Sequence, residues 1–153
     1  ALIHPHLAYC SSVYGMAVPT KINELFLMQK KAIRTITNSN YNAHTGPLFI
    51  NLNILPLKDL ILFNNLKFMH KFTFYRQPIS FNMEWNTNFQ LNPNLILRNV
   101  NDYFIPPHRI EIFKRSPIVH FAKVWNECKA DKRNGNEKAF LKQVKTRLLS
   151  GNP

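Results

Sequence analysis

The chain has 153 residues, of which 45% are hydrophobic and 12% aromatic, enough to bury the core of about one domain. Its 20 Lys and Arg side chains against eight Asp and Glu give a formal net charge of +12, and such a surplus attracts polyanionic partners. Cys10 and Cys128 are too few and too far apart for a disulfide framework or a zinc site, and neither a signal peptide nor a membrane-length apolar run is present, so we expect an intracellular protein. Because the sequence starts on Ala1 rather than Met, we expect a piece of a longer polypeptide.

Helical periodicity predicts a first helix over residues 2–16, with Pro5 confined to its first turn. A second helix is expected to open after Pro19 and Thr20, with Thr20 as its N-cap, and to end at residue 36. A single stripe of this helix faces a core: Ile22, Leu25, Phe26, Gln29, Ile33 and Ile36.

Two further segments carry helical signals before the composition changes. Residues 45–56 predict a short helix begun by Pro47 and then a bend, because proline is favoured in a first helical turn. Residues 57–74 predict a long helix with apolar residues around most of its circumference, which is typical of a central helix buried on several sides.

Residues 76–114 are rich in Pro and Asn, and we expect irregular chain there with one or two short strands. Ser116 and Pro117 predict the N-cap and first residue of a helix that runs through Trp125. A last helix is expected over residues 137–149.

The predicted fold class is therefore mainly α, a helical bundle with a long irregular segment. We expect a thumb-like helical bundle over residues 1–75, with the irregular segment and C-terminal helices of residues 76–153 packed on it. A single domain is the alternative.

No group of residues predicts a catalytic centre. The acids form no cluster with ligand geometry, and no paired aspartates mark a two-metal nucleotidyl-transfer core. The four glycines stand alone, which excludes a phosphate-binding loop, and His4 and His6 point apart on a helix. We expect no catalytic residue, no metal and no cofactor in this segment; an enzyme built on Cys128 and His120 is the least favoured alternative.

Basic side chains on two helices and one in the irregular segment are the candidate contacts to a phosphate backbone. On each helix they lie away from the apolar stripe. A solvated helix face is the ordinary alternative for each group alone, so the prediction depends on the scarcity of acids along the chain. The residues are Lys30, Lys31, Arg34, Arg98, Lys138, Lys142 and Lys145.

Aromatic residues in or beside the irregular segment are candidates for stacking on unpaired bases, with Arg76, Arg98 and Arg109 interleaved. Burial in the core is the commoner fate of such side chains, and the sequence leaves both open. The residues are Tyr75, Trp85, Phe89, Tyr103 and Phe104.

Short motifs also follow one another in a fixed order along nearly the whole chain. They are Leu-Ile-His-Pro-His-Leu-Ala-Tyr at residues 2–9, Leu-Met-Gln-Lys-Lys-Ala-Ile-Arg at 27–34, His-Thr-Gly-Pro-Leu-Phe at 44–49 with Leu52 and Ile54-Leu55, then residues 66–72, Leu97-Arg98-Asn99, Val124-Trp125-Asn126 and Phe140 to Lys142. This succession resembles the region after the catalytic core in reverse transcriptases of non-long-terminal-repeat retrotransposons, the LINE type.

The resemblance implies the thumb and C-terminal part of an RNA-directed DNA polymerase, inactive alone because the palm with its paired aspartates lies upstream. It implies RNA or DNA, bound through the backbone, and the upstream palm and fingers as partners, and a nuclear and cytoplasmic location for an active element. The lack of a membrane-length apolar run separately predicts no membrane partner. The sequence departs from the family where Glu127-Cys128-Lys129 replace Ser-Leu-Pro and where Leu95-Ile96 replace a Tyr, so the copy is divergent.

The alternative from another class is a helical protein-interaction module or decayed retroelement relic. It would bind protein through an apolar groove and carry its charge for solubility. Salt dependence separates the two, because only phosphate binding weakens steeply as salt rises.

Overall fold

The structure, a computed structural model, describes residues 3–75, 85–94, 98–128 and 135–150. Within these ranges the chain is mainly helical and has no β-sheet, which confirms the predicted mainly-α class. The chain packs as two compact units: unit 1 comprises residues 1–64 and 138–153, and unit 2 comprises residues 65–137. The boundaries of these units differ from the domain boundary expected after residue 75. The units are defined by contacts within the chain and do not test how many domains it has, so the expected domain boundary stays a prediction.

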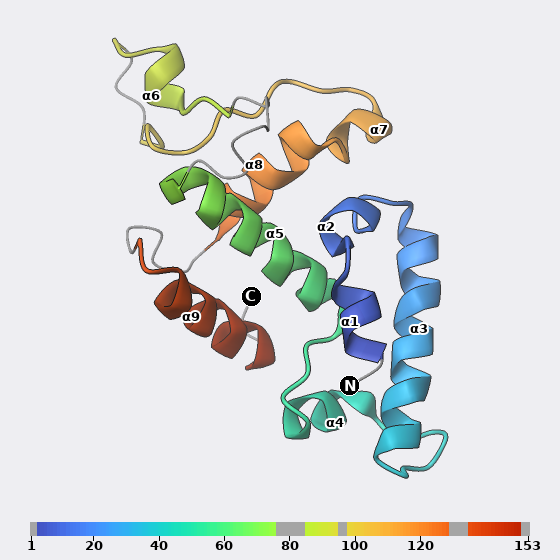
Figure 1. The fold of residues 1–153 in the computed structure, drawn as a ribbon. Helices are drawn as coiled ribbons and strands as arrows, with labels where there is room; N and C mark the ends of the chain where they lie inside the picture. The colour runs from blue at the N-terminus through green and yellow to red at the C-terminus, as the bar shows by residue number, and fades with distance from the viewer. Residues whose placement is uncertain (1–2, 76–84, 95–97, 129–134, 151–153) are drawn as a thin grey trace. The chain divides into compact units, whose positions relative to one another are not determined.

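Two short helices, α1 (Ile3–Ala8) and α2 (Ser11–Tyr14), replace the single helix predicted over residues 2–16 (Figure 1). Between them Cys10 has a φ of 49°, in the left-handed region, and this conformation interrupts a right-handed helix. The Tyr14 hydroxyl donates to the Leu7 carbonyl across the break, and burial raises the pKa of Tyr14. The prediction of one helix is wrong because the spacing of apolar residues contains no information about the backbone conformation of a single residue such as Cys10.

Helix α3 (Pro19–Ile36) has Pro19 as its first residue and Val18 in the cap position. The expectation that Thr20 caps this helix is therefore wrong, since proline itself is well suited to the first helical position. The predicted stripe is present, with Ile22, Gln29 and Ile33 buried, whereas Ile36 at its end is exposed.

Unit 1 has a largely aliphatic core between α3 and the start of α5 (Leu57–Tyr75). Ile22, Leu57 and Ile61 form a buried cluster. Leu7, Tyr14, Leu25 and Phe26 pack against it. At Gly15 a Cβ would lie 2.4 Å from Ile61 Cγ2, so only glycine permits this approach.

Helix α4 (Thr45–Asn51) begins before Pro47, which lies inside its first turn rather than at its start. Its Phe49 is buried and stacks on Phe26 of α3, with ring centroids 6.4 Å apart. In Figure 1 α4 lies near the C-terminal end of α3.

The polar member of the α3 stripe, Gln29, joins α3 to the entry of α5. Its Nε2 donates to the Leu55 carbonyl at 3.1 Å, and its Oε1 accepts from the Leu57 amide at 2.8 Å. A first-turn amide has no partner within its own helix, so Gln29 caps α5 from a distant segment. We call this pair of bonds the Gln29 clamp.

Unit 2 combines the second half of α5 with α8 (Pro117–Glu127) and two single-turn helices, α6 (Asn88–Leu91) and α7 (Glu111–Lys114). Ser116 and Pro117 occupy the cap and first positions of α8 as predicted, and the helix ends at Glu127 rather than Trp125. In the described part of the irregular segment the β-pairing is one antiparallel bridge, between Thr87 and Tyr103.

The core of unit 2 is aromatic. Trp85 packs edge-on against Phe72, with centroids 4.8 Å apart, and Phe68 stacks on Phe121 at 5.0 Å. The Trp85 indole donates to the Ile118 carbonyl at 2.9 Å, so its polar edge is satisfied inside the core.

Asn126 makes a second clamp, the Asn126 clamp, on the backbone of Tyr103. Its Nδ2 donates to the Tyr103 carbonyl at 2.8 Å, and its Oδ1 accepts from the Tyr103 amide at 2.9 Å. The Tyr103 hydroxyl also shares a hydrogen bond of 2.8 Å with Thr73. The Trp125-Asn126 motif thus has a structural role: it fastens the irregular segment to α8.

Helix α9 (Glu137–Leu149) has the predicted bounds and buries Phe140 and Val144. Its opposite face carries the predicted lysines. Of the helices that can be described, none has the length and apolar composition needed to cross a bilayer.

Candidate nucleic-acid interface

The three basic residues predicted on α3 have different environments. Lys31 is exposed, while Lys30 is half-buried and its Nζ lies 4.3 Å from the centroid of the Phe26 ring. Arg34 donates from Nε to the Ala43 carbonyl at 3.0 Å and so braces the turn between α3 and α4. Lys31 is therefore the residue of the three that is most available to a phosphate, and Arg34 also has a structural task that the sequence does not reveal.

On α9, Lys138 and Lys142 are exposed and Lys145 is half-buried. Their spacing places them along one side of the helix, across from Phe140 and Val144. The structure thus groups these three lysines on one helix face, as predicted, while their role in binding stays a prediction.

Acidic residues are scarce in unit 1. Glu24 pairs with Lys21, with Nζ and Oε2 3.0 Å apart, and Asp59 is half-buried, where desolvation raises the pKa of its carboxyl group. The same unit contains nine basic residues: Lys21, Lys30, Lys31, Arg34, Lys58, Lys138, Lys142, Lys145 and Arg147.

Unit 2 places acids beside its cations. The Nζ of Lys71 lies 3.7 Å from the Oε1 of Glu137, and the Nζ of Lys123 lies 3.9 Å from the Oε1 of Glu127. Lys114 pairs with Glu111 at 3.0 Å, and the hydrogen bond and charge of Lys114 lower the pKa of the Glu111 carboxyl. Arg98, predicted as a contact, is exposed in this unit and takes part in no ion pair that the structure describes.

The five aromatic residues considered for base stacking divide into two groups. Trp85 and Tyr103 are buried, with 4% and 7% of their surface exposed, and belong to the core. Tyr75, Phe89 and Phe104 are exposed, and Tyr75 donates its hydroxyl to the Gly135 carbonyl. Stacking is therefore wrong for the two core residues and stays open for the exposed ones.

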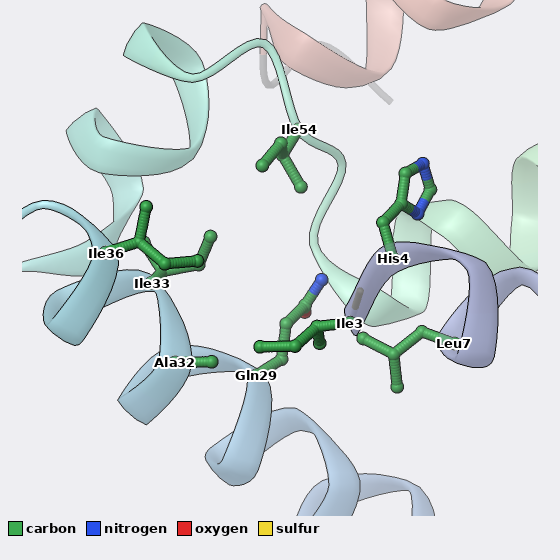
Figure 2. Close-up of a pocket in the computed structure, with 8 residues that line it drawn as sticks. All are labelled: Ile3, His4, Leu7, Gln29, Ala32, Ile33, Ile36 and Ile54. Atoms are coloured by element: carbon green, nitrogen blue, oxygen red, sulfur yellow. The ribbon is translucent and has the colours of Figure 1, made fainter. Parts of the chain in front are cut away.

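A cavity of about 280 Å³ opens between α1, α3 and the connector that follows α4 (Figure 2). Figure 2 shows aliphatic side chains converging on it from all three segments. Gln29 and His4 are its polar residues, and the polar atoms of Gln29 are already used in the Gln29 clamp, so the lining is mainly apolar. The aliphatic lining consists of Ile3, Leu7, Ala32, Ile33, Ile36 and Ile54.

The ring of His120 forms a hydrogen bond within unit 2. Its Nε2 lies 3.0 Å from the Nδ2 of Asn65, a buried amide on α5. Burial lowers the pKa of His120, the charge of Lys123 lowers it further, and Glu127 opposes them. A neutral ring that accepts from Asn65 explains this environment without a catalytic role.

The chain contains no assembled metal site within the ranges that the structure describes, since no three His, Cys, Asp or Glu side chains gather there. No protein-family model, curated protein or solved structure matches the chain.

Proposed function

We propose that this chain is the thumb and C-terminal part of a LINE-type reverse transcriptase and that it binds the backbone of a template–primer duplex. The ordered motifs along the sequence support the parentage. The observation that carries the binding activity is the charge of unit 1, which contains nine Lys and Arg residues and two acids.

The two acids of unit 1 do little to neutralise these cations. Glu24 is paired with Lys21, and Asp59 is the other acid of the unit, so the acids are outnumbered by the cations whatever the position of Asp59. Lys31 on α3 and Lys142 and Lys145 on α9 therefore supply an attraction for phosphates, and neutralising each phosphate releases a condensed counterion.

Backbone contacts suit a thumb because they hold a duplex in register without reading its sequence. Lys31 of α3 and Lys142 and Lys145 of α9 are the principal contacts in this proposal. Lys30 and Lys138 add charge beside them, and Arg34 contributes only the part of its guanidinium that the Ala43 bond leaves open.

The test measures binding of the chain to a labelled RNA–DNA hybrid across a salt series. The variant K31Q/K142Q/K145Q removes three cations from unit 1. The matched control, K21Q/K114Q/K123Q, removes three exposed cations that each lie beside an acid: Glu24, Glu111 and Glu127. Both variants lose the same net charge.

The wild type is expected to give a log–log salt slope of about −4 to −6, corresponding to about six phosphates. The unit 1 variant should lower its magnitude by about two to three, and the control by less than about one. A flat slope, or equal effects of the two variants, would reject the proposed backbone contacts.

The cavity in unit 1 favours one other function, a helical module that binds protein. Its aliphatic lining, which includes the exposed Ile3 and Ile36, suits an apolar anchor from a partner. Binding of that kind would change little with salt, so the same salt series discriminates between the two functions.

A further inference from the structure

The irregular segment contains a short paired ribbon, residues 86–91 and 99–104, that the proposed duplex contacts do not use. Within it the Thr87 hydroxyl and the Gln90 side chain form a reciprocal cap that fixes α6. The two sides are joined by backbone hydrogen bonds from Asn88 to Asp102 at 2.9 Å, from Phe89 to Val100 at 3.0 Å and from Phe104 to Asn86 at 2.9 Å.

This ribbon is fastened firmly to the core of unit 2. The Asn126 clamp holds the backbone of Tyr103, and the hydroxyl of Tyr103 bonds to Thr73. Trp85, immediately before the ribbon, is buried and bonded to the Ile118 carbonyl. The ribbon therefore presents its outer side chains from a fixed backbone, which reduces the entropy lost when a ligand binds.

The outer side chains are those that unpaired nucleotides require. Phe89 and Phe104 expose 54% and 41% of their surface, and Arg98 is exposed beside the ribbon. The exposed amide of Asn99 and the Nε2 of Gln90, whose Oε1 is used in the cap, accompany them. Aromatic faces stack on bases, arginine meets phosphates, and amides form hydrogen bonds with base edges.

We propose that this ribbon binds a single-stranded stretch of RNA or DNA, with bases stacked on Phe89 and Phe104 and the backbone near Arg98. The site lies in unit 2 and takes unpaired bases, so it goes beyond the proposed backbone grip of unit 1. The net charge of +12 disfavours a second copy of the chain, which would bring the same charge, and favours a polyanion. At the ribbon itself the charges are one cation, Arg98, and one acid, Asp102, so the proposal depends on stacking on the exposed rings more than on local charge.

The test compares two labelled strands of about ten nucleotides, one of oligothymidylate and one of the same length with abasic sugars throughout. Both strands have the same phosphate charge, so their difference in affinity reports the bases alone. The wild type should prefer the base-bearing strand by about tenfold or more, as expected for stacking on an exposed ring.

The variant F89L/F104L retains apolar side chains at both positions but removes the rings. It should bind both strands with nearly equal affinity and keep the abasic affinity of the wild type. The matched control Y9L/Y41L removes two exposed rings from unit 1 and should retain the full preference. Near-ultraviolet circular dichroism verifies that each variant is folded.

Equal affinity of the wild type for the two strands would overturn the proposal and leave the ribbon as an apolar surface for a protein partner. A preference that persists in F89L/F104L would also overturn it. The variant K31Q/K142Q/K145Q should leave the preference for the base-bearing strand unchanged, so a failure of the duplex contacts in unit 1 is distinguishable from a failure of this site.

Discussion

Unit 1 contains nine Lys and Arg residues and two acids, Glu24 and Asp59, whereas unit 2 contains eleven Lys and Arg residues and six acids. The cores differ as well: unit 1 buries mainly Ile and Leu, and unit 2 buries Trp85, Phe72 and Phe121. The net charge of the whole chain conceals this difference. The comparison indicates that Lys31 and Lys142 of unit 1 are exposed and take part in none of the ion pairs that the structure describes, while several cations of unit 2 have acids beside them.

One device is common to both units. The Gln29 clamp in unit 1 and the Asn126 clamp in unit 2 each use one carboxamide to satisfy a backbone carbonyl and a backbone amide. A buried backbone N–H or C=O without a hydrogen-bond partner costs free energy. Each clamp supplies such partners to a segment outside regular helix or sheet, and so stabilises that segment.

The largest expected effect is in the aromatic core of unit 2. Trp85→Ala should destabilise this unit by about 3–5 kcal/mol, because it removes a buried indole and the ring contacts around it. Urea denaturation followed by hydrogen exchange on peptides of α8 measures the loss. The exposed neighbour Leu91→Ala is the control, and a similar loss in both variants would contradict the assignment of Trp85 to the core.

The two clamps should have comparable effects in their own units. Gln29→Ala and Asn126→Ala are each expected to cost about 2–4 kcal/mol, because each leaves two backbone groups without their partner. Hydrogen exchange locates the effect: faster exchange at Leu57 and the first turn of α5 for the first variant and around Tyr103 for the second. Unchanged exchange in those segments would show that the clamps do not stabilise them.

The aliphatic core of unit 1 is sensitive to one added methyl group. Gly15→Ala should cost about 1–3 kcal/mol, since its Cβ would lie 2.4 Å from Ile61 and 2.5 Å from the Ser11 carbonyl. Gly46→Ala is the matched control, because a Cβ there meets nothing within 4 Å and should stabilise the chain by about 0.4–1 kcal/mol. Equal effects of the two substitutions would contradict the close packing at Gly15.

The smallest effect is a pH dependence in unit 2. Burial lowers the pKa of His120 below 6.5, so the unfolded chain takes up this proton more readily than the folded chain. The stability that the neutral ring contributes is complete above 6.5 and falls as the pH drops from 6.5 toward the lowered pKa. Tryptophan fluorescence reports this, because Trp85 and Trp125 both belong to unit 2.

The variant His120→Gln keeps an amide oxygen that can accept from Asn65 but removes the titrating group. Its free energy of unfolding should change less than that of the wild type between about pH 7.5 and pH 5.5. Identical pH profiles would exclude His120 as the source.

Periodicity predicted the long helices because their apolar stripes repeat over several turns, and α9 has the expected bounds. The helix expected over residues 2–16 is interrupted at Cys10, where a backbone conformation, rather than a side-chain pattern, decides the structure. Thr20 was expected to cap α3 because its side chain suits that position, but Pro19 already begins the helix.

The sequence predicts which helix face carries the candidate basic residues, but it does not predict the hydrogen bonds and burial of each side chain. Lys31 and Lys142 are exposed as expected, whereas the bond from Arg34 to Ala43 depends on a turn whose path the sequence does not specify. The fates of Trp85 and Phe89 likewise depend on contacts between distant segments. A polar residue within an apolar stripe, as at Gln29, is a signal that could have pointed to its clamp.

The most direct test of the central claim is lysine footprinting, in which the chain is acetylated with and without an RNA–DNA hybrid and each lysine is quantified by mass spectrometry. One experiment then compares both units under identical conditions. The hybrid should protect Lys31, Lys142 and Lys145 of unit 1 and leave Lys114 and Lys123 of unit 2 unchanged. Protection confined to unit 2, or spread evenly over all lysines, would contradict the assignment of the backbone contacts to unit 1.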